Sequence, residues 1–188
     1  MQPMVNIALR AARQAGEMIV KAADNLESVE VSEKSKNDFV TEIDKRSEQI
    51  IIDSILKAYP DHHFLSEERG FDGNNSSDVQ WIIDPLDGTT NFVRGIPYVS
   101  VSIACMIKGK LEHAVVLEPF SHDEFTASRG FGAKLNGRRI RVSGKTDKNG
   151  ALYATGVPFN DPSFKHMKEY LKCLHEFAEN SCGVRRMG

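Results

Sequence analysis

The hydrophobic pattern of this chain changes near residue 60 from helical spacing to strand-like runs, and that change constrains the fold most. Apolar residues recur at helical spacing over residues 4–23 and again from Thr41 to the stop at Tyr59-Pro60. Thr41 and Asp44 have the spacing of a capping box, with Asp in place of Glu. The polar stretch between the helices, residues 32–37, is predicted to be a loop.

Short apolar segments separated by turn signals follow the second helix. Residues 70–78 are rich in Gly, Asn, Ser and Asp and predict a turn region. Asn136-Gly137 predicts a type I′ hairpin. A last amphipathic helix is predicted over residues 163–179. The expected strands cover residues 64–68, 79–83, 98–107, 111–117, 124–128 and 151–156.

This order of elements predicts an α+β fold, a layered sandwich in which two helices precede a large, mostly antiparallel sheet. We expect an N-terminal α+β domain over residues 1–150. Residues 151–188 would then begin a second, incomplete α/β layer.

Composition excludes some functions. The net charge of −2 over 188 residues argues against a direct nucleic-acid site, which needs a clustered basic surface. Three widely spaced cysteines form no CxxC pair, so they suggest neither zinc nor a disulfide framework, and a reducing cytoplasm is expected. We expect no signal peptide and no membrane span, since no apolar stretch approaches roughly 18 residues.

The segment from Trp81 to Phe92 carries the chemistry. An apolar strand delivers Asp84 to its end, Pro85 stiffens the exit, and Asp87 follows around a tight turn. Two such carboxylates would repel one another unless a cation held them, and oxygen ligands without His or Cys favour Mg²⁺. The Leu86 carbonyl could complete the cluster. On spacing alone, an Asp/Gly-rich surface turn is an equal alternative.

Glycine and threonine follow these carboxylates. Gly88 permits close approach to a ligand, and the amides of a helical turn beginning here would seat a phosphate. The Thr89 hydroxyl could orient a water molecule. A simpler alternative is that Thr89 is only a helix N-cap.

Three segments together resemble the inositol monophosphatase family of magnesium-dependent phosphomonoesterases. Asp84-Pro85-Leu86-Asp87-Gly88-Thr89-Thr90-Asn91, after Trp81-Ile82-Ile83, is similar to the first signature of that family. Asp38-Phe39-Val40-Thr41-Glu42-Ile43-Asp44 is similar to its Asp-x-Val-Thr-x-x-Asp segment, and Ser66-Glu67-Glu68 to its Glu-Glu segment. The resemblance covers essentially the whole chain and looks closest to the bacterial SuhB-type branch.

The resemblance implies a role for each matching residue. Glu67, Asp84 and the Leu86 carbonyl would hold one Mg²⁺, Asp84 and Asp87 a second, and Glu67 a weaker third through water. Asp44 and Thr89 would activate the attacking water, supported by Glu68. The reaction would be lithium-sensitive hydrolysis of a polyol phosphate, foremost inositol-1-phosphate. Substrate binding would fall to Asp87, Gly88, Thr89, Arg185 and Gly188, and Lys36 would lie in a covering loop.

Several of these residues could instead have a purely structural role. Asp44 could be only a helix N-terminal acid, and Glu67 and Glu68 a solvated pair. The family also continues to a second signature, Trp-Asp-x-Ala-Ala-Gly, which would lie beyond Gly188. We therefore expect a C-terminally shortened member whose second metal site lacks one ligand.

A second hypothesis comes from a different functional class. SuhB-type proteins are implicated in transcription antitermination through contacts with transcription factors, so the chain could be an interaction partner with little or no catalysis. Related phosphatases act on fructose bisphosphate or phosphoadenosine nucleotides. The resemblance also implies a homodimer.

Overall fold

The computed structural model describes residues 2–26, 31–35, 38–72, 77–158, 165–179 and 181–186; side chains 31–40 and 72 are not among the described atoms. The chain forms two compact units, residues 1–141 and 142–188, and each is treated separately. The domain division at residue 150 stays a prediction, because a compact unit need not be a domain that folds alone.

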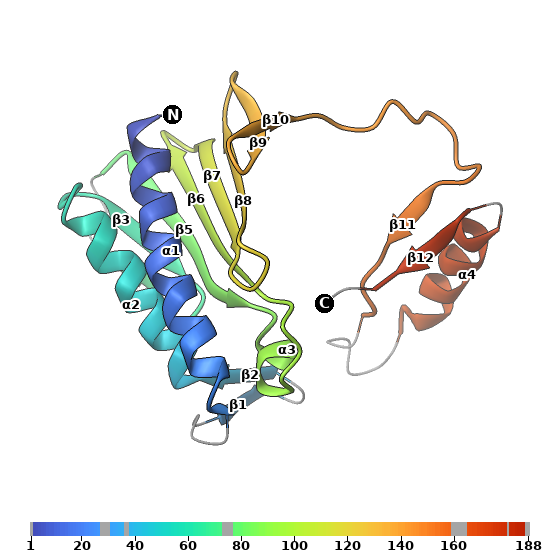
Figure 1. Ribbon diagram of the computed structural model, residues 1–188, viewed down its shortest axis with the longest axis horizontal. Coiled ribbons are helices and arrows are strands. Elements are labelled where there is room, and N and C mark those ends of the chain that lie inside the picture. The colour runs from blue at the N-terminus through green and yellow to red at the C-terminus, as the bar shows by residue number, and fades with distance from the viewer. Residues whose placement is uncertain are drawn as a thin grey trace. The chain divides into compact units, whose positions relative to one another are not determined.

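Two helices cover one face of the sheet in the first unit (Figure 1). Helix α1, Pro3–Ala23, begins with proline at its first position, where the missing N–H costs no hydrogen bond. Helix α2, Glu42–Leu56, begins with the predicted capping box: the Thr41 side chain accepts from the Asp44 N–H, and the Thr41 N–H donates to the Asp44 carboxylate. Both predicted helices are confirmed.

Eight strands form one sheet in the order β10-β9-β8-β7-β6-β5-β3-β4. All neighbouring strands are antiparallel except β3 and β5, which are parallel. The strands are β3 His63–Ser66, β4 Gly70–Asp72, β5 Val79–Asp87, β6 Ser100–Ile107, β7 Lys110–Glu118, β8 Asp123–Ser128, β9 Gly132–Leu135 and β10 Arg138–Ile140. The α+β class and the mostly antiparallel sheet are confirmed.

The core lies between the sheet and the two helices. Trp81 and Phe64 are its largest buried side chains, and α1 packs closely enough on β7 that Gly16 lies against Leu117. The opposite face carries one continuous apolar row across all eight strands, in register. That row is Phe71, Leu65, Ile82, Ala104, Ala114, Ala127, Ala133 and Ile140.

Two predictions about loops are wrong. Residues 31–35 form strand β1, Val31–Ser35, which pairs with β2, Asp38–Thr41, so most of the polar stretch is a small antiparallel sheet. The start of the expected turn region, Gly70–Asp72, is the edge strand β4. Neither segment shows the alternating apolar pattern of a strand. Each is a strand because its backbone groups form hydrogen bonds with a partner strand. The hairpin at Asn136 and Gly137 is confirmed, with φ of 50° and 78°.

The second unit contains a short parallel pair and one helix. Strand β11, Leu152–Ala154, was predicted, whereas its partner β12, Gly183–Arg185, was not. Helix α4, Met167–Ala178, has no buried residue, and the start of the predicted helix at Ser163 falls outside the described residues. Within the described ranges, no helix combines the length and apolarity needed to cross a membrane.

Gly16 tests the contact between α1 and β7. A Cβ at this position would lie 2.8 Å from Leu117 Cδ2 and 3.2 Å from Pro119 Cβ. We expect Gly16→Val to destabilise the fold by about 1–3 kcal/mol, because the helix must move away from the sheet. Urea unfolding measures this change. Glu17→Val, on the exposed side of the same helix, should cost less than 1 kcal/mol; equal losses for both variants would contradict the packing argument.

Candidate active site

The parallel pairing of β3 with β5 places two acidic segments side by side. Ser66 lies opposite Ile83, and the Glu67 N–H donates to the Ile83 carbonyl at 3.2 Å, so Glu67 lies next to Asp84. Glu68 and Arg69 continue into the turn before β4. The strand end predicted for Asp84 is confirmed in part, since β5 continues past it to Asp87.

A bulge in β5 brings Asp84 and Asp87 together. Asp84 and Asp87 are three positions apart in the chain, while their partners on β6, Ser102 and Ser100, are only two positions apart. The Pro85 carbonyl accepts a hydrogen bond from the Ser47 hydroxyl of α2 at 2.7 Å, which fixes the bulge to the helix. Asp87 is exposed, and the Ser100 hydroxyl lies 3.4 Å from its Oδ2.

The carboxyl group of Asp84 has a strongly raised pKa. Burial, and then the negative charges of Glu67 and Asp87, raise its pKa to about 7. Its Oδ1 atom is buried and has no hydrogen-bond partner among the described residues. An orphaned buried carboxylate oxygen beside two other acids is what a hard cation would satisfy, so the donor set fits Mg²⁺.

These carboxylates are neighbours but do not form a closed cage. Within the described residues, no group of three or more His, Cys, Asp or Glu side chains is arranged to hold a metal ion. The Asp84 and Glu67 side chains are hydrogen-bonded to each other, and the charges of Glu67 and Asp87 disfavour the ionised form of Asp84, so a cation bound here would relieve that repulsion. The Leu86 carbonyl, also expected to bind metal, lies 3.0 Å from the Thr89 hydroxyl.

Asp44 and Thr89 form the second part of the site. The Thr89 hydroxyl lies 3.0 Å from Asp44 Oδ1, and its single proton can serve either Asp44 or the Leu86 carbonyl. The Thr41 hydroxyl and N–H donate to the other Asp44 oxygen at 2.5 and 2.8 Å. Burial raises the pKa of Asp44, and these donors from Thr41 and Thr89 act against that rise.

Gly88 connects this pair to the bulge. It has φ 94° and caps the short helix α3, Thr89–Val93; a Cβ would lie 3.2 Å from the Tyr98 carbonyl, so only glycine fits without strain. The predicted start of a helical turn is therefore confirmed. The buried side chain of Phe92 anchors α3 to the hydrophobic core.

Sequence reasoning missed the groups that hold the acidic turn in place. The Arg69 Nε lies 2.8 Å from Glu48 Oε2, the Arg69 N–H donates to Glu48 Oε1 at 3.3 Å, and the guanidinium also bonds the Gln49 side chain. Glu48 is fully buried on α2. Ser47 and Glu48 lie three and four residues after Asp44, so polar residues at buried helical spacing were the available signal.

The expected substrate residues of the second unit stay predictions. Arg185 ends β12, and its Nη1 donates to the Val184 carbonyl at 3.1 Å. Gly188 and Lys36 fall outside the described residues.

Comparison with known proteins agrees with this geometry. The family model described as "Inositol monophosphatase family" matches residues 1–188. A protein named Nus factor SuhB from Pseudomonas aeruginosa is 52% identical over 190 residues, which cover all of this chain and 70% of that protein.

Solved structures match as well. The extragenic suppressor protein suhB from Bartonella henselae has a TM-score of 0.94 at 36% identity, covering 100% of this chain and 71% of that one. An inositol monophosphatase from Anabaena has a TM-score of 0.79 at 32% identity, covering 98% and 66%. The predicted sandwich of the sugar-phosphatase type is thereby confirmed.

Asp84→Asn tests whether the cluster is built for a cation. At pH 8 without divalent ions, we expect the variant to have a higher Tm than the unsubstituted chain, because it removes a buried charge beside Glu67 and Asp87. MgCl₂ should raise the Tm of the unsubstituted chain and not that of the variant. Thermal unfolding followed by circular dichroism measures both effects.

Asp78→Asn serves as the matched control, since Asp78 is exposed just before β5 and pairs only loosely with Lys108 at 3.7 Å. It should leave the response to MgCl₂ unchanged. A Tm increase with MgCl₂ that is equal in all three proteins would show that the cation binds elsewhere.

Proposed function

Because the chain belongs to the inositol monophosphatase family, we propose that it hydrolyses a small polyol phosphate with the help of Mg²⁺. Members of this family are generally Mg²⁺-dependent phosphatases. The observation that carries the proposal is the meeting of two groups at the end of β5. One is the set of acids around the orphaned Asp84 oxygen, and the other is the hydroxyl–carboxylate pair of Thr89 and Asp44.

In the proposed mechanism, Glu67, Asp84, Asp87 and the Leu86 carbonyl would hold two or three Mg²⁺ ions. When bound, these ions neutralise phosphate oxygens, lower the pKa of water and stabilise the leaving oxygen. Asp87 connects this cluster to the substrate. The protein contributes mainly positions and charges.

The proton steps fall to Asp44 and Thr89. The Thr89 hydroxyl donates to Asp44 Oδ1, which leaves its oxygen lone pairs free to accept from a water. The ionised form of Asp44, which accepts hydrogen bonds from Thr41 and Thr89, then takes the proton that the water releases through Thr89. Glu68 supports this network, and the N–H groups of Gly88 and Thr89 hold the phosphate.

Inositol-1-phosphate is the substrate that we propose first. A relative in the same fold is named an inositol monophosphatase, which supports this class of ester. Fructose bisphosphate and phosphoadenosine nucleotides are the alternatives. Lithium sensitivity, a homodimer, a cytoplasmic location and contributions of Arg185 and Gly188 to substrate binding belong to the same proposal.

A second function has separate support. The relative from Pseudomonas aeruginosa is named a Nus factor, at 52% identity. We propose that this chain can also bind transcription antitermination factors. A double variant, Asp84→Asn with Asp87→Asn, separates the two functions, because it removes the proposed metal ligands and leaves the rest of the surface in place. Its retained binding to an elongation factor in a pull-down assay would support the second function.

Thr89→Val tests the proposed water-activating pair. It keeps the side-chain shape and removes the hydroxyl, so we expect kcat for inositol-1-phosphate to fall by about 10²–10⁴-fold with little change in Tm. Thr89→Ser should retain most activity. Phosphate release with titrated MgCl₂, with and without LiCl, is the measurement.

Thr90→Val is the matched control, because Thr90 is the exposed neighbour of Thr89 on α3. It should behave like the unsubstituted chain. If Thr89→Val were as active as Thr90→Val, the assignment of Thr89 would be wrong, and turnover without any divalent cation would contradict the metal-assisted mechanism.

A further inference from the structure

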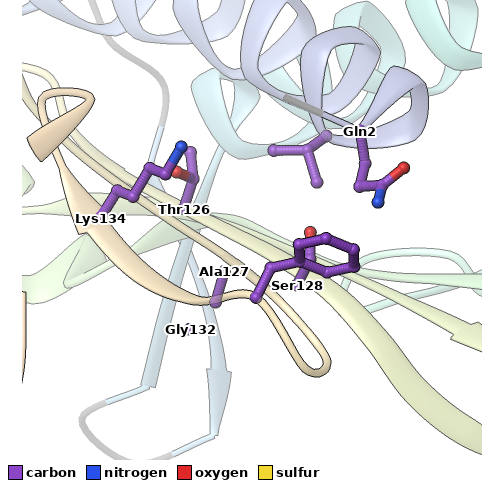
Figure 2. A pocket seen from close by; sticks show the side chains of 8 residues that line it. Gln2, Thr126, Ala127, Ser128, Gly132 and Lys134 are labelled. Atoms are coloured by element: carbon purple, nitrogen blue, oxygen red, sulfur yellow. The ribbon is translucent and has the colours of Figure 1, made fainter. Parts of the chain in front are cut away.

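A pocket of about 230 Å³ lies in the first unit between the start of α1 and strands β8 and β9 (Figure 2). Figure 2 shows Lys134 and Thr126 on the strand side, with Gln2 across from them at the start of the helix. The space suits a small molecule rather than a single water. Its lining residues are Gln2, Val5, Thr126, Ala127, Ser128, Phe131, Gly132 and Lys134.

A polar side chain without a partner faces this pocket. Thr126 is only 7% exposed, and its hydroxyl forms no side-chain hydrogen bond with any described residue. Lys134 lies directly opposite Thr126 in the β8–β9 ladder. It forms no ion pair within the described part of the chain. The Thr126 hydroxyl and the Lys134 ammonium group thus lie on neighbouring strands at this pocket, and both can donate to an anion.

The surroundings of the pocket are electropositive. None of the lining residues is acidic, and Arg139 pairs with Lys134 in the β9–β10 hairpin. A guanidinium nitrogen of Arg139 lies 3.5 Å from where a Gly132 Cβ would be. Glu124, the acid nearest in sequence to Thr126, is engaged by Arg13 through two hydrogen bonds of 2.6 and 2.7 Å. The first turn of α1 contains no acid and adds the positive end of the helix dipole.

The pocket also has an apolar wall. Phe131 is 65% exposed, and Val5 completes this side. An aromatic side chain left in solvent beside cationic and hydroxyl donors suits a ligand that carries both an anionic group and a carbon skeleton.

This pocket is separate from the acidic cluster. Thr126 lies on the helix-covered face, in one cross-strand row with Val115, Ile103 and Ile83. Its strand, β8, is the third strand from β5 in the sheet. At strand spacing, that is a lateral separation of about 14 Å. A molecule bound by Lys134 therefore does not contact Asp84 or Asp87.

We propose that this pocket is a second ligand site, which binds a small organic phosphate through Lys134, Arg139 and the Thr126 hydroxyl. A phosphate fits better than a carboxylate because an ammonium, a guanidinium and a hydroxyl group together offer enough donors for its three terminal oxygens. The site needs no divalent cation, which distinguishes it from the site of hydrolysis and makes it independent of the proposed function.

The test is a titration of the ¹⁵N-labelled chain with glycerol 3-phosphate in EDTA, followed by amide NMR. We expect shifts confined to the first turn of α1 and to residues 126–139. Lys134→Gln should weaken binding about tenfold or more, as loss of a charge-assisted hydrogen bond implies. Thr126→Val should weaken it by a smaller factor. Inorganic phosphate should bind more weakly, and glycerol should not bind.

Lys110→Gln is the matched control, because it removes the same charge from an exposed position on β7. It should leave the dissociation constant unchanged. The proposal would be overturned by absent shifts at residues 126–139 up to 50 mM ligand, by shifts confined to residues 84–89, or by equal affinities of the Lys134 and Lys110 variants.

Discussion

The half-buried carboxyl group of Asp84 is the constraint around which the first unit is arranged. Three separate devices hold it beside other acids: the parallel register of β3 and β5, the bulge at Pro85, and the hydrogen bond from Ser47 to the Pro85 carbonyl. Each of these fixes backbone rather than side chains. The carboxylates therefore keep their positions although their charges repel, and the fold accepts this electrostatic cost at the point where a cation would relieve it.

Side chains of helix α2 hold the segments of the site in place. Asp44, Ser47 and Glu48 lie on its buried side, and each reaches a different part of the site. The Glu48–Arg69 ion pair fixes the turn that follows Glu67 and Glu68, since the Arg69 guanidinium lies beside one Glu48 oxygen and the Arg69 backbone N–H donates to the other. Removing Arg69 would leave the buried Glu48 carboxylate uncompensated, so this pair ties the acidic turn to the helix more firmly than a fully exposed pair could.

The sequence predicted those helices, turns and strands that are determined by residues close together in the chain. The capping box at Thr41, the Asn136-Gly137 turn and the strand running into Asp84 all depend on residues adjacent in the chain. It failed for β1, β4 and β12, because these short strands exist through pairing with distant partners and carry no alternating pattern of their own. The same limit applies to Arg69 and Ser47, whose roles follow from the contact of α2 with the β3–β5 pair.

The near-neutral net charge of the chain conceals two local fields of opposite sign. One gathers carboxylates at the end of β5, and the other gathers Lys134 and Arg139 around an unpartnered hydroxyl. Their separation of about 14 Å exceeds the screening length of roughly 8–10 Å at physiological salt, so solvent-exposed charges at one place hardly act on the other. Any influence of the pocket on the acidic cluster would therefore have to pass through the strands between them and the packing of α1 on those strands. The contact of Gly16 with Leu117 makes that packing close.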